Sequence, residues 1–186
     1  MNDDGPFEEV DACNEAGRRC LERGDRQGAC EQFTRALERL GSRPNPRRKA
    51  ALLNNLGHVL VSLDRRDDAL EKFREAARLC EELGDRAGLG WQLGNVGSVY
   101  RDKEDHEAAL ENYSKALSVF EEQDNPLGIA DQCGNIGYIH AMKREPEAAL
   151  GYFQKAKALY ESLGEERKAS LAEKNIQILS SLGRGA

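Results

Sequence analysis

Apolar residues recur at every third or fourth position over most of the chain, which is the spacing of one face of an α-helix. Between 106 and 123 they fall at Ala109, Leu110, Tyr113, Ala116, Leu117 and Phe120. No stretch of useful length alternates apolar and polar residues as a β-strand does. Polar breaks interrupt the pattern at regular intervals. The sequence therefore predicts helices at about 6–23, 26–40, 46–63, 66–83, 86–103, 106–123, 126–143, 146–163 and 166–182.

The pattern repeats after forty residues. Four series of aligned residues mark the repeat: Asn55, Asn95, Asn135 and Asn175; Gly17, Gly57, Gly97 and Gly137; Ala29, Ala69, Ala109 and Ala149; and Phe33, Phe73, Tyr113 and Phe153. A fixed period of this length indicates a solenoid, in which each helix pair buries its apolar face against its neighbours. The sequence predicts an all-α solenoid of antiparallel helix pairs. We expect one domain over residues 1–186, with repeats at about 6–40, 46–83, 86–123 and 126–163.

Glycine inside a helix costs about 1 kcal/mol relative to alanine. The recurrence of Gly57, Gly97 and Gly137 therefore predicts a close approach of two helix backbones, with the aligned alanines as the small partner surface. Gly41, Gly84 and Gly164 stand where second helices should end. The segment 166–182 is predicted to be a capping helix, whose polar residues Lys168, Glu173, Lys174, Gln177 and Ser181 stand beside Leu171, Ile178 and Leu182.

The five cysteines are explained by the same alignment. They occupy positions that hold large apolar residues in other repeats, and their odd number without a CxxC pair disfavours a disulfide framework or a zinc site. We expect all five to be small buried apolar residues: Cys13, Cys20, Cys30, Cys80 and Cys133.

Leu56 and Gly57, followed by A-L-x-x-F-x-x-A from Ala69 to Ala76, resemble the tetratricopeptide repeat signature. The repeat is six residues longer than the usual unit of about 34, and it lacks the signature tryptophan. The G-N-x-G openings and the stretch ELGDRAGLGWQLGNVGSVY resemble the long-repeat subclass of Pins/LGN-type scaffold proteins. The resemblance covers residues 6–182. It implies a right-handed superhelix whose concave face, formed by the first helix of each pair, binds a peptide of a partner protein.

Carried over to this sequence, the resemblance places the peptide-binding residues beside the packing positions of three first helices: Asn54, Asn55 and His58; Trp91, Asn95, Ser98 and Arg101; and Asp131, Asn135 and Tyr138. A ladder of amides could hold a peptide backbone without requiring a particular sequence. Alternatively, these asparagines tie one repeat to the next through backbone hydrogen bonds. Trp91 is either an exposed anchor, as tryptophan often is at binding sites, or packs over the region of Gly88 and Gly90.

Catalytic and metal-binding patterns fail on their spacing. His106 and Glu107 resemble the start of an HExxH zinc motif, but the second histidine is missing. Gly88, Gly90 and Gly94 lack the spacing of a dinucleotide fingerprint and no strand precedes them. We therefore expect no enzymatic activity, no metal and no cofactor.

Charge and hydropathy exclude two further classes of partner. The formal net charge is −6, which disfavours nucleic acid and anionic lipid. No apolar run approaches the roughly 20 residues that span a bilayer, and the first residues lack the features of a signal peptide. We expect a cytoplasmic protein that is a monomer or a weak homo-oligomer.

Two functions remain for such a chain. The first is a protein–protein interaction scaffold that binds a peptide segment of a partner in its concave groove. The second is a self-association or regulatory sensor module, whose face is covered by a second copy or by another domain. The first is favoured because the packing positions repeat, whereas the candidate binding positions differ from repeat to repeat, as a specific binder requires.

Overall fold

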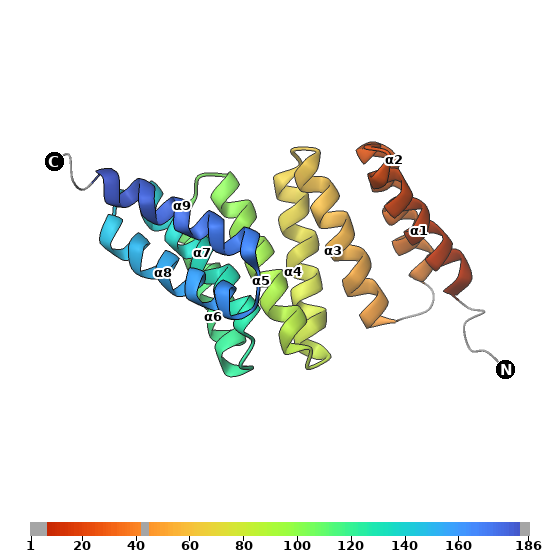
Figure 1. Ribbon diagram of the computed structural model, residues 1–186. Coiled ribbons are helices and arrows are strands. Elements are labelled where there is room, and N and C mark those ends of the chain that lie inside the picture. The colour runs from red at the N-terminus through yellow and green to blue at the C-terminus, as the bar shows by residue number, and fades with distance from the viewer. Residues whose placement is uncertain (1–6, 42–44, 183–186) are drawn as a thin grey trace. The chain divides into compact units, whose positions relative to one another are not determined.

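The computed structural model describes residues 7–41 and 45–182, and the described residues are helical apart from the short links between helices. The helices are α1 (Glu8–Glu22), α2 (Arg26–Leu40), α3 (Pro46–Ser62), α4 (Arg66–Glu82), α5 (Arg86–Asp102), α6 (His106–Glu122), α7 (Pro126–Met142), α8 (Pro146–Ser162) and α9 (Glu166–Leu182) (Figure 1). Each predicted helix is present and ends within about two residues of its predicted bounds. Residue 6, where the first helix was predicted to begin, lies outside the described residues.

The chain divides into two compact units, residues 1–92 and 93–186, with the division inside α5. In the first unit α1 packs on α2, α2 on α3 and α3 on α4; in the second, α6 packs on α7, α7 on α8 and α8 on α9. Each helix reverses direction after a short link, so neighbours in the chain are neighbours in space. This is the predicted all-α solenoid of paired helices. The expectation of a single domain over 1–186 stays a prediction.

The links repeat one backbone conformation. From α3 to α9, three residues separate each helix from the next, and the middle residue has positive φ: Asp64, Gly84, Glu104, Asp124, Arg144 and Gly164. In the link after α4, the N–H of Asp85 donates to the carbonyl of Cys80 at 2.8 Å, so a carbonyl at the helix end is satisfied. Gly84 and Gly164 thus end their helices as predicted. Gly41 also follows its helix, but with an ordinary φ of −54°.

Asparagine, aspartate and proline begin many of the helices. The side chains of Asp25, Asn45, Asp105 and Asn125 each accept a hydrogen bond from the backbone N–H three residues later. Such caps stabilise a helix by about 1 kcal/mol each. Proline occupies the first turn of α3, α7 and α8, where its missing N–H costs nothing.

The helix glycines make room for aromatic rings, which corrects the predicted alanine partner. A Cβ placed on Gly57 would lie 2.5 Å from a ring carbon of Phe73, and one on Gly97 would lie 2.7 Å from the ring of Tyr113. Gly17 and Gly137 have the same relation to Phe33 and Phe153. The aligned alanines are fully buried in the second helices, but the nearest neighbour of each glycine is the ring.

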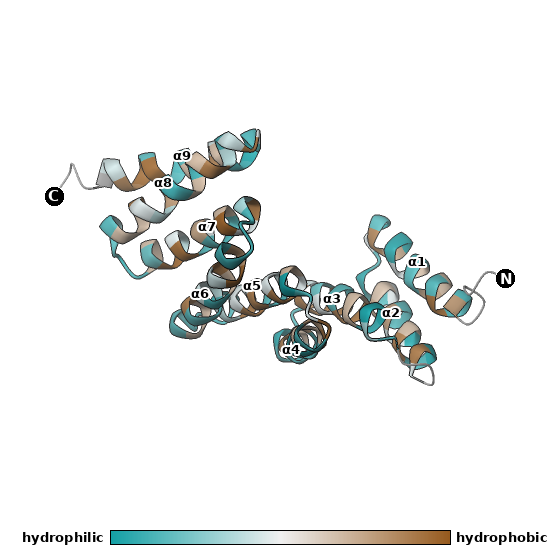
Figure 2. Cartoon of the chain, turned by 90° about the horizontal axis from the view of Figure 1, so that it is seen from below, coloured by the Kyte–Doolittle hydropathy of each residue, from teal (hydrophilic) through white to brown (hydrophobic). Residues whose placement is uncertain are grey.

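The helix α9 caps the second unit differently from the prediction. Its buried residues are the small Ala169 and Ala172, which face the rest of the unit, whereas Leu171 and Ile178 are 61% and 57% exposed. The exposed residues of this helix are therefore apolar as well as polar, and Figure 2 shows both hydrophobic and hydrophilic residues along α9.

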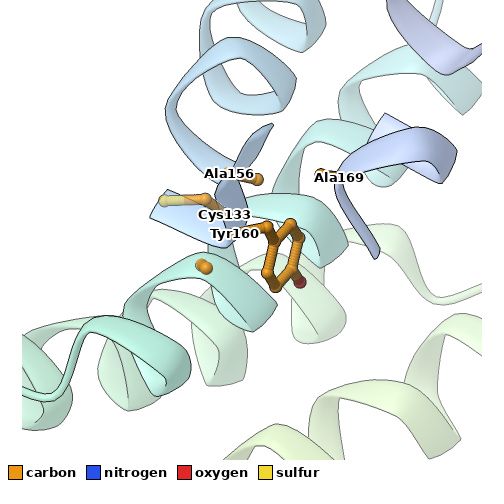
Figure 3. Packing of buried hydrophobic residues seen from close by; sticks show 5 residues of the cluster. Cys133, Ala156, Tyr160 and Ala169 are labelled. Atoms are coloured by element: carbon orange, nitrogen blue, oxygen red, sulfur yellow. The ribbon is translucent and has the colours of Figure 1, made fainter. Parts of the chain in front are cut away.

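The cysteine prediction holds for three of the five positions. Cys30, Cys80 and Cys133 are buried, and Cys133 packs with Ala156, Tyr160 and Ala169 in the core of the second unit (Figure 3). Cys13 and Cys20, both on α1, are only partly buried. They correct the prediction: among the described helices α1 packs mainly on α2, which leaves these two side chains partly exposed.

Candidate protein-interaction face

The candidate binding residues of the sequence lie on α3 and the start of α5 in the first unit, and on the rest of α5 and α7 in the second. The name first-helix face is used here for these residues, each unit being described by itself. On α5 and α7 consecutive members are three or four positions apart, so they lie on one side of each helix; on α3, Asn54 and Asn55 are adjacent and His58 follows four and three positions later. Their individual environments separate those that hold the fold together from those that are open to a ligand.

On α3, the two asparagines join neighbouring repeats within the first unit. The Nδ2 of Asn55 donates to the Oδ1 of Asn14 on α1 at 3.2 Å, and the Oδ1 of Asn54 accepts from the Nε2 of Gln92 at 3.1 Å. These bonds support the interpretation that the asparagines tie repeats together. Their partners are side-chain amides, where the sequence predicted backbone groups.

His58 is the exposed member of the face on α3. Its ring contacts Phe73 edge-on, with the centroids 5.2 Å apart and an interplanar angle of 70°. Desolvation on this covered side lowers the pKa of His58. The imidazole is therefore neutral near pH 7 and offers one hydrogen-bond donor and one acceptor.

On α5, Trp91 and Asn95 are partly buried, and each is engaged by neighbouring residues. Trp91 is therefore not fully exposed, as the prediction of an exposed anchor required. The roles of both residues in binding stay predictions.

Ser98 supports the core. It accepts a hydrogen bond from the Tyr113 hydroxyl at 3.1 Å, and its own hydroxyl donates to the carbonyl of Gly94 at 3.1 Å. Burial raises the pKa of Tyr113, so the phenol stays neutral and needs an acceptor. Ser98 supplies that acceptor.

Asp131 links three helices of the second unit. Its carboxylate accepts from the Tyr160 hydroxyl of α8 at 2.6 Å and from the Lys168 ammonium of α9 at 2.7 Å. The same ammonium lies 5.5 Å from the centre of the Tyr160 ring. Burial, followed by the bond to Asp131, raises the pKa of Tyr160. Asp131 is therefore a structural residue, whose oxygens are already engaged.

Arg101, Asn135 and Tyr138 form an open group in the second unit. The Arg101 guanidinium lies 5.9 Å from the centre of the Tyr138 ring and donates to Asp102 at 2.8 Å. Tyr138 is 45% exposed. In the described part of the chain, the Asn135 amide makes no hydrogen bond. These three side chains offer a cation, an aromatic ring and a free amide.

Two buried glutamines were missed by the sequence reasoning. Gln92 is 7% exposed and Gln132 is 2% exposed, and the Oε1 atom of each has no hydrogen-bond partner among the described residues. They occupy the position that Leu52 holds one or two repeats earlier. A polar residue at an otherwise apolar repeat position was the signal that could have identified them.

Three exposed apolar residues were also missed as candidates: Met142 on α7, and Leu171 and Ile178 on α9. Ile178 aligns with Tyr138, and Leu171 aligns with Asp131, so both fall at positions of the first-helix face. They were overlooked because the prediction treated the last helix as a polar cap.

The second unit also contains a cavity that none of the candidate binding residues lines. This cavity of about 520 Å³ opens between α8 and α9, where Lys157 joins Glu161 at 3.3 Å and Glu173 at 3.2 Å. No group of three or more histidine, cysteine, aspartate or glutamate residues in the described ranges could hold a metal ion. None of the described helices is both long enough and apolar enough to cross a bilayer.

By sequence, residues 48–122 match the family model described as "Tetratricopeptide repeat". No curated protein matches the chain by sequence. The subclass of forty-residue repeats resembling Pins/LGN-type scaffolds stays a prediction.

By structure, the chain is similar to BtubC from P. vanneervenii, with a TM-score of 0.67, 16% identity and coverage of 97% of this chain and 93% of that one. It is similar to aspartyl phosphate phosphatase F from Bacillus subtilis, with a TM-score of 0.79, 18% identity and coverage of 96% and 52%. It is also similar to a signal transduction ATPase with a tetratricopeptide repeat sensor from Pyrococcus horikoshii, with a TM-score of 0.87, 14% identity and coverage of 94% and 27%.

The chain thus spans about half of the Bacillus protein and about a quarter of the Pyrococcus protein. Identities this low establish a shared fold only. Residues 48–122 match the tetratricopeptide repeat by sequence, and the described helices share the fold of proteins that carry such repeats.

Proposed function

We propose that this protein is a non-catalytic interaction module that binds a peptide segment of a partner protein on its first-helix face. Three kinds of support agree. Residues 48–122 match a repeat whose known role is protein interaction. The packing positions repeat along the chain, whereas the face positions vary. The residues of the face also include groups that the fold itself does not use.

The observation that carries the proposal is the group of Arg101, Asn135 and Tyr138. Arginine and tyrosine are enriched at binding hot spots because they combine a large apolar surface with a polar end. Here the guanidinium lies over the ring, and an unbonded amide sits three residues before the tyrosine on the same helix. An exposed aromatic ring and a free amide contribute little to the stability of the folded protein. In a complex with a partner, the Tyr138 ring could bury apolar surface and the Asn135 amide could form hydrogen bonds.

The proposal is tested with a phage-displayed library of random 16-residue peptides selected on the intact protein. We expect enriched peptides to bind in solution, and the double variant Arg101→Ala/Tyr138→Ala to bind them at least tenfold more weakly by isothermal calorimetry. Lys115→Ala is the control, because Lys115 is an exposed residue of α6 that pairs with Glu111 away from the first-helix face.

Circular dichroism confirms that both variants are folded. The proposal fails if no peptide is enriched, or if the double variant binds the selected peptides as tightly as the unchanged protein does.

Self-association or a regulatory sensor role is the second candidate, with the face covered by a second copy or by another domain. The exposed Leu171 and Ile178 favour self-association, because exposed apolar patches often mark interfaces. Light scattering at several protein concentrations tests it. A dimer that forms with rising concentration and loses peptide binding would support this candidate over the first.

A further inference from the structure

The described residues include six exposed large apolar side chains, and four of them lie on α7 and α9 in the second unit: Tyr138, Met142, Leu171 and Ile178. The remaining two, Leu21 and Leu163, lie near helix ends. Exposed apolar residues that gather on one part of a surface often mark an interaction site.

These four residues lie on neighbouring helices. The ammonium of Lys168 on α9 reaches the carboxylate of Asp131 on α7 at 2.7 Å and 3.1 Å. Both helices pack against α8 and reverse its direction, so α7 and α9 run the same way. Residues that follow Asp131 and Lys168 by equal numbers of positions therefore lie at similar heights, which places Tyr138 close to the level of Asn175 and Ile178.

The spacing of the apolar residues suits a helical ligand. Leu171 and Ile178 are seven residues apart, or about 10.5 Å along the helix axis. An amphipathic helix presents apolar side chains at positions i, i+3, i+4 and i+7, which cover the same length on one side. Such a ligand satisfies its own backbone hydrogen bonds, so it needs few polar groups from the surface that it covers.

One positive charge beside the apolar residues of α9 is unpaired among the described residues. Lys174 lies between Leu171 and Ile178 in the sequence of α9, and no carboxylate of the described residues lies within ion-pair distance of it. The neighbouring Glu173 is engaged by Lys157 at 3.2 Å. On the other side of the group, Arg101 lies over the Tyr138 ring, but its guanidinium already donates to Asp102 at 2.8 Å. A ligand that carries carboxylates beside its apolar residues would complement Lys174.

We propose that the α7–α9 surface, formed by Arg101, Tyr138, Met142, Leu171, Lys174 and Ile178, binds an acidic amphipathic helix of a partner protein. This assignment rests on the proposed function and names the chemistry of its partner. A second copy of the chain fits the surface less well, because a symmetric contact through α9 would bring Lys174 close to its own counterpart.

The probe is a fluorescein-labelled 18-residue peptide with leucine along one helical face and glutamate elsewhere. Three control peptides test its properties one at a time. One has lysine for glutamate and tests charge, one has a central proline and tests helix formation, and one has the same leucines at alternate positions and tests their spacing. We expect the acidic helical peptide to bind with a Kd in the micromolar range by fluorescence anisotropy. Each control peptide should bind at least tenfold more weakly.

Protein variants locate the contact. Lys174→Glu and Ile178→Ser should each weaken binding of the acidic helical peptide at least tenfold, and the weakening by Lys174→Glu should shrink at high salt. Lys115→Glu makes the same charge change on α6 and should leave binding unchanged.

Equal binding of the lysine control peptide would overturn the charge assignment. Equal or tighter binding of the alternate-leucine peptide would show that the ligand is extended. A dimer of the unliganded protein that Ile178→Ser disrupts would assign the surface to a second copy. If the phage-selected peptides bind through Arg101 and Tyr138 but are neither acidic nor helical, the proposed function stands and this assignment fails.

Discussion

The side chain of Gln132 is buried against Gly94, and its carbonyl oxygen lacks a hydrogen-bond partner among the described residues. A Cβ on Gly94 would lie 3.1 Å from that oxygen, so the glycine provides the space that the amide occupies. An unsatisfied buried acceptor costs about 1–3 kcal/mol. The aligned residue two repeats earlier is Leu52, which is buried without such a cost.

We therefore expect Gln132→Leu to raise the free energy of unfolding by about 1 kcal/mol or more. Urea denaturation followed by circular dichroism measures the change. The matched control is Gln177→Leu on the exposed side of α9, which should change the free energy by less than about 0.5 kcal/mol. A loss of stability in Gln132→Leu would mean that the amide has a partner or that leucine does not fit beside Gly94.

At the scale of single elements, some links between helices place a residue other than glycine in the left-handed backbone conformation. The middle residue of each described link from α3 to α9 has positive φ, yet Glu104 and Arg144 occupy two of these positions. Left-handed backbone costs a residue with a Cβ roughly 1 kcal/mol, whereas glycine adopts it freely. Aspartate, as at Asp64 and Asp124, tolerates it better.

Glu104→Gly and Arg144→Gly should therefore each stabilise the protein by up to about 1 kcal/mol. The reverse change, Gly84→Ala, should destabilise it by about 1 kcal/mol, and its effect is purely conformational because no atom lies within 4 Å of the added Cβ. Thermal unfolding of the three variants provides the measurement. If the glycine variants unfold at a lower temperature, then contacts of the Glu104 or Arg144 side chain outweigh the backbone cost.

The helices were predictable from sequence because the forty-residue alignment marks every break, even where Glu104 or Arg144 stands in place of glycine. The roles of the first-helix face residues were harder to predict from sequence. Asn54 and Asp131 have the polarity of ligand-binding groups, but they are held by Gln92 and by Tyr160, partners that only the packing of helices brings near. The exposure of Leu171 could not be deduced because a leucine at a helical position usually indicates burial.

At the scale of the whole molecule, several buried groups must stay uncharged in the folded state. Burial raises the pKa of Cys133 to about 11, and it raises the pKa values of Cys80, Tyr113 and Tyr160 as well. A raised pKa of an acid means that the folded state holds its proton more tightly than the unfolded state does. The stabilisation is complete below the unfolded pKa and is lost as the pH rises through the folded value.

We expect the urea midpoint to fall between about pH 9 and pH 11, with Cys133 alone contributing roughly 1 kcal/mol of the loss by pH 10. Cys133→Val, which keeps the site apolar, should flatten the pH dependence in this range when compared under reducing conditions. Equal loss in both proteins would show that Cys133 titrates normally in the folded state.

The contact between a helix glycine and an aromatic ring joins residues only sixteen positions apart, such as Gly57 and Phe73. Closing so short a loop costs little chain entropy, and the contact is completed within a single hairpin. Proteins dominated by local contacts of this kind refold rapidly. Refolding could therefore start in any one of the hairpins and spread to the others without waiting for the chain ends to meet.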